Sequence, residues 1–310
     1  MSFSGVFSEF LSKAWSDHGN HPEQTAQSLP TGLELCKSPD DVISLVNLTA
    51  HLYTEHHPKF IEGERHLREF AKNSFAKGTP AEFAVARTIA AFRMCEGTLD
   101  PETDRMGLTP GDLARALGFA ASALSVRDSV RAEKFLKLAL SLVASLELTA
   151  TDGIARGMAI AGNNASASVL ELSELPEQCE PTEQQRSFML LAAETARKYW
   201  EIAGTWLETE RAEHHLANCY LRAGKVEEAR EHAKLCLSIS ESNGALPLEM
   251  FFALEGLGKI EKVTLGKVTV PTLERATEWF DKIAEADKTW AQASFDKLQS
   301  YGSGEEISST

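Results

Sequence analysis

The sequence predicts an all-α protein made of antiparallel helix hairpins, and three observations support this prediction. Apolar residues recur at helical spacing, three or four positions apart, along almost the whole chain. Helix start signals recur as well, in which a capping Ser or Thr precedes a proline and an acidic residue. The alternating pattern of a β-strand is confined to KVTV at 267–270. With 43% hydrophobic residues, a chain of 310 residues can bury a sizeable core.

The first hundred residues are expected to form five helices without a recognisable repeat. The stretch SPDD (38–41) starts one of them, because serine caps the helix, proline fits its first turn and the two acids lie at the positive end of its dipole. The stretch TPAE (79–82) starts another, which ends at Gly97. The five helices are expected near 4–16, 22–36, 39–56, 59–77 and 80–96.

The region 101–300 is expected to contain nine further helices. The stretch TPGD (109–112) caps the first, and the polar, proline-bearing stretch 174–184 is the clearest internal break. Because the loops are short, successive helices should pack as antiparallel neighbours. Residues 301–310 are expected to be a disordered tail. The nine helices are expected near 110–126, 128–147, 152–174, 182–205, 207–223, 226–242, 246–263, 271–286 and 288–300.

Small residues occupy fixed positions in the segment HLANCYLRAGKVEEAREHAKLCLSI (215–239). Ala217 on the first helix and Ala229 on the second would let the two helices approach closely, while Tyr220 fills the wider space beside them. Gly224 ends the first helix. Counted from Glu210 as position 1, these residues fall at 8, 20, 11 and 15, and the pattern resembles a tetratricopeptide repeat.

The resemblance is clear in this one unit and weaker elsewhere. Within the unit, Ala233 at position 24 departs from the family, which has an aromatic residue or Leu there, and Cys236 replaces the usual small residue at 27. Looser copies start at 113, 159 and 247, so 101–300 is identified as the repeat region. The resemblance implies hairpins stacked as an α-α superhelix, a TPR-like solenoid, whose concave face binds a partner protein or peptide.

The resemblance also implies candidate partner-binding residues on the first helix of each pair. Some members of the family hold a C-terminal carboxylate with a basic residue at position 5 and an Asn at position 9. Only one unit here has this pair, as His214 and Asn218, so a mixed polar groove is favoured over such a grip. The third alternative is that these side chains are ordinary solvated residues. The predicted partner-binding residues are Arg115, Asn163, Arg211, His214 and Asn218.

A second function class depends on the N-terminal histidines. The stretch HLYTEHH (51–57) places His51 and Glu55 one turn apart, a spacing that can hold two metal ligands, and His56 and His66 follow. Histidines at a helix end also complement the helix dipole. No nucleophile motif is present, and GLGK (256–259) follows no strand, which argues against a phosphate-binding loop. We therefore expect a non-enzymatic adaptor or scaffold without a cofactor; the alternative is a metal-binding or enzymatic helical protein with its site at these histidines.

The charge and the cysteine content limit which kinds of partner and which cellular compartment we expect. The net charge of −14 disfavours binding to nucleic acid and to anionic membrane surfaces. The five cysteines are scattered and never form a Cys-x-x-Cys pair, which is typical of a reducing compartment. With no signal-like N-terminus or long apolar stretch, a cytoplasmic protein is expected. A homodimer through an exposed end of the stack is also compatible with the sequence.

Overall fold

The computed structural model describes residues 5–151, 153–174 and 180–303. This part of the chain contains fourteen α-helices, one π-helical turn and one 3₁₀ turn, and no strand. The all-α prediction is therefore confirmed. The segment KVTV lies between two helices and its last residue, Val270, begins the second of them; the backbone N–H of Val268 donates to the carbonyl of Tyr301 at 3.2 Å. Among the described residues, no helix combines the length and the apolar character needed to cross a membrane.

The chain divides into two compact units, Met1–Glu147 and Leu148–Thr310, which are described separately. In the first unit, each helix packs against the next or the next but one, and α3 and α5 are in direct contact. Its elements are α1 (Gly5–Asp17), α2 (Pro22–Leu35), α3 (Pro39–His51), the π turn η1 (Leu52–His56), α4 (Phe60–Phe70), α5 (Pro80–Glu96), α6 (Pro110–Leu124) and α7 (Ser129–Val143).

The helix starts in this unit follow the capping chemistry that the sequence predicts. The side chain of Ser38 accepts the N–H of Asp41 at 3.2 Å at the start of α3. Thr79 and Thr109 cap α5 and α6 in the same way. Two helix ends differ from expectation. The helix expected at 39–56 ends as the π turn η1, in which the N–H of His57 donates to the carbonyl of Leu52 at 2.8 Å. The helix expected at 59–77 is shorter than predicted, since α4 ends at Phe70.

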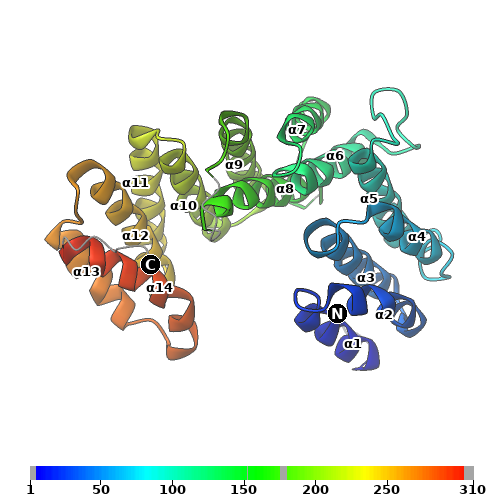
Figure 1. Cartoon of the computed structure of the whole chain (residues 1–310), viewed down its shortest axis with the longest axis horizontal. Coiled ribbons are helices and arrows are strands. Elements are labelled where there is room, and N and C mark those ends of the chain that lie inside the picture. The colour runs from blue at the N-terminus through cyan, green and yellow to red at the C-terminus, as the bar shows by residue number, and fades with distance from the viewer. Residues whose placement is uncertain (1–4, 152, 175–179, 304–310) are drawn as a thin grey trace. The chain divides into compact units, whose positions relative to one another are not determined.

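The second unit consists of three helix pairs and a last helix. The pairs are α8 with α9, α10 with α11, and α12 with α13; the first helices α8, α10 and α12 also contact one another in that order. Figure 1 shows α10 to α14 next to one another, and α14 packs on α12 and α13. The bounds are α8 (Gly153–Leu170), the 3₁₀ turn η2 (Glu171–Glu174), α9 (Glu183–Ala203), α10 (Trp206–Arg222), α11 (Val226–Asn243), α12 (Pro247–Leu265), α13 (Val270–Asp281) and α14 (Glu285–Ser303).

Small residues lie where the helices of a pair meet. Ala217 of α10 packs with Ala229 and Ala233 of α11 in one buried cluster. In α8, a Cβ atom built on Gly162 would lie 2.5 Å from the carbonyl oxygen of Ala192 in α9. The close helix contact predicted from the alanine spacing is therefore present between α10 and α11, and a glycine serves the same purpose between α8 and α9.

The last three helices share a core of aromatic rings that fixes their relative positions. Phe280 of α13 and Phe295 of α14 stack with ring centroids 3.9 Å apart, and Phe251 of α12 meets Phe280 edge-on at 5.5 Å. These contacts hold α14 against α12 and so position the side chains that α14 presents beside the groove described below.

The compact units and the predicted regions divide the chain differently. The units separate at Glu147, so α6 and α7, which the sequence assigns to the repeat region 101–300, belong to the first unit. In the segment 301–310, expected to be disordered, residues 301–303 continue α14 and the others lie outside the described residues. The start of the repeat region near 101 and its assignment to the tetratricopeptide type stay predictions.

Candidate functional site

A cavity of about 540 Å³ opens between α10, α12 and α14 in the second unit. This volume lies within the range of small-ligand and side-chain pockets, about 300–1,000 Å³. Its lining combines apolar, acidic and basic side chains: Glu210, Arg211, His214, Leu248, Glu249, Phe252, Asp287 and Trp290. We call this feature the α10–α14 groove.

The aromatic side chains of the groove lie on two different helices. Trp290 of α14 is 77% exposed, the most exposed large hydrophobic side chain among the described residues. Phe252 and Leu248 of α12 are partly buried, and the ring of Phe252 lies 5.9 Å from that of His214. An exposed tryptophan beside a partly apolar cavity is a common feature of binding surfaces, because burying its ring releases a large apolar area.

Two acidic side chains of the groove are buried, and each has a different partner. Glu249 accepts a hydrogen bond from the Arg211 guanidinium at 2.7 Å. Glu210 accepts one from the Cys236 thiol at 3.0 Å and one from the Ser240 hydroxyl at 3.2 Å. Burial raises the pKa of Glu210, and these neutral donors only partly offset it. The groove therefore holds carboxyl groups that have few cationic partners.

A third buried acid, Glu255, continues this polar network along α12. Glu255 is 2% exposed, and its carboxylate forms an ion pair with the Lys259 ammonium at 2.8 Å. The other carboxylate oxygen lies 3.6 Å from Nε2 of His214 and has no hydrogen-bond partner. Burial pushes the pKa of Glu255 up, but the charges of Lys259 and His214 outweigh burial and the pKa is lowered. Glu255 is therefore ionised at neutral pH.

The structure brings together three of the five predicted partner-binding residues. Arg211, His214 and Asn218 follow one another along α10 and face α12. Asn218 donates to the carbonyl of His214 at 2.9 Å and accepts from Lys259 at 3.1 Å. Arg211 and His214 already face the buried carboxylates of Glu249 and Glu255. This geometry differs from a site in which unpaired basic side chains bind a partner's C-terminal carboxylate.

The other two predicted residues lie elsewhere. Asn163 is half-buried on α8, away from the groove lining, and Arg115 is half-buried on α6 in the first unit. The partner-binding residues predicted from the sequence did not include Glu249, Phe252 and Trp290, although the tryptophans as a group are spaced as core or groove anchors. The sequence does contain a signal for Glu249. Glu249 and Glu255 interrupt an otherwise apolar helical stretch, and a charge in such a position needs a buried partner.

On the other side of α10, His215 connects the groove helix to α8. Its Nε2 atom lies 2.8 Å from the Ser166 hydroxyl and 3.6 Å from the sulfur of Cys219. Burial, with the nearby His214 as a smaller cause, lowers the pKa of His215 to about 4. His215 is therefore neutral at pH 7 and holds two first helices of successive pairs together.

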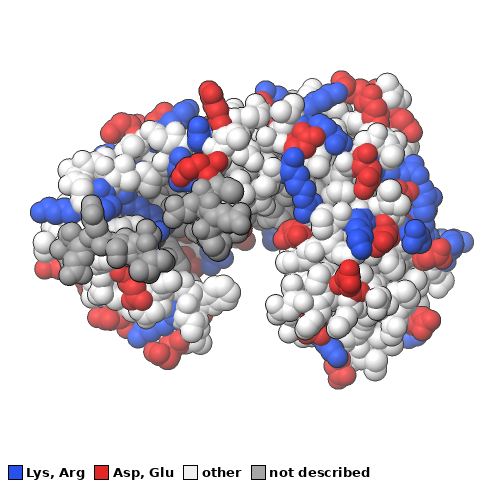
Figure 2. Space-filling view, in the orientation of Figure 1, with Lys and Arg blue, Asp and Glu red and all other residues white. Residues whose placement is uncertain are grey.

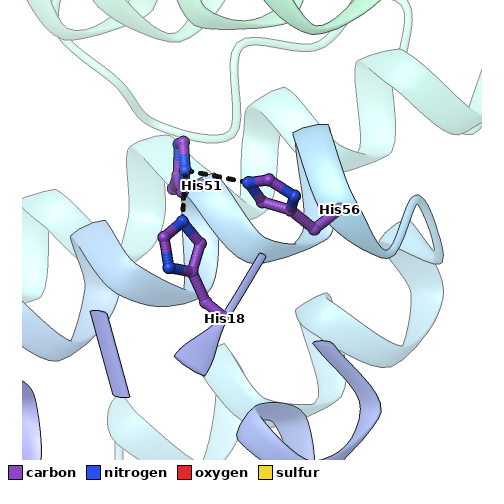
Figure 3. Close-up of side chains that lie close together, drawn as sticks. All are labelled: His18, His51 and His56. Carbon is purple, nitrogen blue, oxygen red and sulfur yellow. Dashed lines mark hydrogen bonds between the residues drawn. The ribbon is translucent and has the colours of Figure 1, made fainter. Parts of the chain in front are cut away.

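The histidines singled out in the first unit do not all come together. His51 and His56 meet His18, which the sequence reasoning did not include, and Figure 3 shows the three rings pointing toward one another. Nε2 of His51 lies 2.9 Å from Nε2 of His18 and 3.3 Å from Nε2 of His56. Glu55 lies behind His51, with Oε1 3.0 Å from Nδ1. His66 is outside this group, with its ring 6.0 Å from that of Tyr53.

Comparison with known proteins adds no family to this geometry. Neither the protein-family models nor the curated proteins contain a match to this chain. On the face seen in Figure 2, the basic and acidic side chains of the described residues are interspersed over both units.

Proposed function

We propose that the protein is a non-enzymatic interaction module that holds a segment of a partner protein in the α10–α14 groove. The single observation that carries this proposal is Trp290, 77% exposed beside a cavity of about 540 Å³. A large indole left in water at the mouth of a partly apolar cavity gains most when another chain covers it.

The charges of the groove indicate which segment would fit. Its lining contains three acids, Glu210, Glu249 and Asp287, against one permanent cation, Arg211, which already pairs with Glu249. Asp287 and Trp290 are three residues apart on α14 and so share one face of that helix. A Lys or Arg of the partner could therefore lie over the indole ring and beside the Asp287 carboxylate. We propose a segment with an apolar side chain for the cavity next to a basic one.

The proposal also includes the tetratricopeptide-like architecture that the sequence resembles. Pairing of α8 with α9, α10 with α11 and α12 with α13, together with contact among the first helices, supports a stack of this type. In such a stack the partner lies along the first helices, which is where Arg211, His214 and Asn218 are found. Our proposed setting is the reducing cytoplasm, supported by four described cysteines that are all free and buried.

Selection from a displayed random-peptide library on the purified protein tests this proposal. Selected peptides should share an apolar residue adjacent to Lys or Arg. Their affinity should fall about thirtyfold in Trp290→Ala, since an interface tryptophan typically contributes about 2 kcal/mol.

Val263→Ala is the matched control, because Val263 is an exposed hydrophobic residue of the same unit outside the groove lining. Its affinity for the selected peptides should be unchanged. Equal losses in both variants, or selected peptides without the shared pattern, would argue against the groove. Concentration-dependent self-association that is lost in Trp290→Ala would instead identify a second copy of the chain as the occupant.

A further inference from the structure

We propose that His18, His51 and His56 bind one Zn²⁺ ion through their Nε2 atoms. The three side chains come from the turn that follows α1, from the last residue of α3 and from the π turn η1. Their ligand atoms all lie within 4.8 Å of one another. This site is independent of the α10–α14 groove, which lies in the other unit.

The distances between the nitrogens match a zinc site. Zinc holds imidazole nitrogens at about 2.0–2.1 Å in a tetrahedral arrangement, which places two such nitrogens about 3.3 Å apart. In this cluster the separation is 2.9 Å between His18 and His51 and 3.3 Å between His51 and His56. The ligand atoms of His18 and His56 lie within 4.8 Å of each other, so all three rings face one common point between them.

The partners of the other ring nitrogens indicate where the protons lie. Nδ1 of His51 faces the Glu55 carboxylate at 3.0 Å, and Nδ1 of His18 faces the Trp15 carbonyl at 2.6 Å. Both partners are acceptors, so each Nδ1 carries the hydrogen, and in a neutral imidazole the opposite nitrogen then holds a lone pair. Two lone pairs 2.9 Å apart repel each other unless a cation lies between them. A metal ion provides that cation.

Two further features support a metal centre. A carboxylate behind a histidine, as Glu55 is behind His51, orients the ring and increases its basicity, which is the usual outer shell of a zinc ligand. The π turn brings residues five positions apart, His51 and His56, onto one side of the chain, and such turns are frequent at functional sites.

The surroundings of the cluster also suit a metal ligand set. The indole of Trp15 lies 5.2 Å from the rings of both His18 and His51 and so covers one side of them. The site would fasten the turn between α1 and α2 to the end of α3. Three protein ligands leave a fourth position for water or another ligand.

Titration of the metal-free full-length protein with zinc chloride, followed by calorimetry, tests the proposal. We expect one Zn²⁺ per chain in the wild type and binding at least a hundredfold weaker in His18→Ala and His51→Ala. Glu55→Gln should weaken binding about tenfold to a hundredfold, since it removes only the outer-shell partner. His66→Ala is the matched control, because this histidine lies in the same unit outside the cluster, and it should bind like the wild type.

A spectroscopic measurement on the wild type tests the site even if a variant that lacks one of the histidines fails to fold. The wild type loaded with Co²⁺ should show the intense visible absorption of a four-coordinate site, and Zn²⁺ should displace it stoichiometrically. Circular dichroism checks that each variant keeps its helix content. Absence of one-to-one binding, or equal binding by folded His18→Ala, would overturn the proposal and indicate that the three nitrogens share a proton instead.

Discussion

Replacing Gly162 with Ala tests whether close helix contact stabilises the second unit. A Cβ atom at this position would lie 2.5 Å from the carbonyl oxygen of Ala192 and 2.8 Å from the backbone nitrogen of Ala196. Ordinary contact begins near 3.4 Å, so the first distance is short by about 0.9 Å. Both atoms belong to the backbone of α9, which cannot yield without moving the helix. Overpacking of this kind costs about 1–3 kcal/mol, against a gain of about 1 kcal/mol from the higher helix propensity of Ala.

Gly256 offers the same substitution in a site with room. It lies inside α12, and a Cβ atom there would meet only the His214 ring at 3.5 Å, an ordinary contact. Gly256→Ala should therefore keep the helix-propensity gain and stabilise the unit by up to about 1 kcal/mol.

Urea unfolding followed by circular dichroism compares the two variants within the same unit. Gly162→Ala should lower the free energy of unfolding by up to about 2 kcal/mol, which corresponds to a fall of up to several degrees in Tm. Gly256→Ala should leave it unchanged or raise it. If Gly162→Ala proves as stable as Gly256→Ala, the inference that α8 and α9 pack too closely for a side chain at position 162 is wrong.

Two further predictions concern buried polar groups of the second unit. Because the pKa of His215 is lowered to about 4, the unfolded chain takes up a proton below pH 6.5 while the folded chain does not, and the free energy of unfolding should fall by about 3 kcal/mol between pH 7 and pH 4. His215→Gln should lose that much less over the same range, and parallel pH profiles of the two proteins would contradict the assignment. Arg197→Met leaves the fully buried Glu213 with His232 alone and should cost about 3 kcal/mol in urea unfolding. Lys282→Met removes the partner of the exposed Glu278 and should leave the free energy of unfolding nearly unchanged, so similar losses in both variants would count against the buried pair.

Helix positions could be predicted from the sequence because their signals are local. The stretches around Ser38, Thr79 and Thr109 each contain a capping side chain and a proline, and the helices begin there. The π turn after His51 escaped prediction, because its extra backbone spacing has no signal in the helical periodicity. The same holds for the early end of α4 at Phe70.

The candidate sites could be predicted only in part, because they depend on contacts between distant segments. The repeat register placed Arg211, His214 and Asn218 on one face of α10, where the structure has them. It could not place Trp290, since that side chain reaches the groove through the packing of α14 on α12. His18 was missed for the same reason, as it lies 33 residues before His51 in the chain.

The proposal that the α10–α14 groove holds a partner is tested most directly by placing a photoreactive benzoylphenylalanine at position 290. The same residue at position 263 serves as the control, since Val263 is exposed on α12 but outside the groove lining. On irradiation in an extract of the source cells, position 290 should cross-link to a segment with an apolar residue next to a basic one, and excess library-selected peptide should abolish the product. Position 263 should give no such product. Equal cross-linking at both positions, or none at 290, would contradict the account.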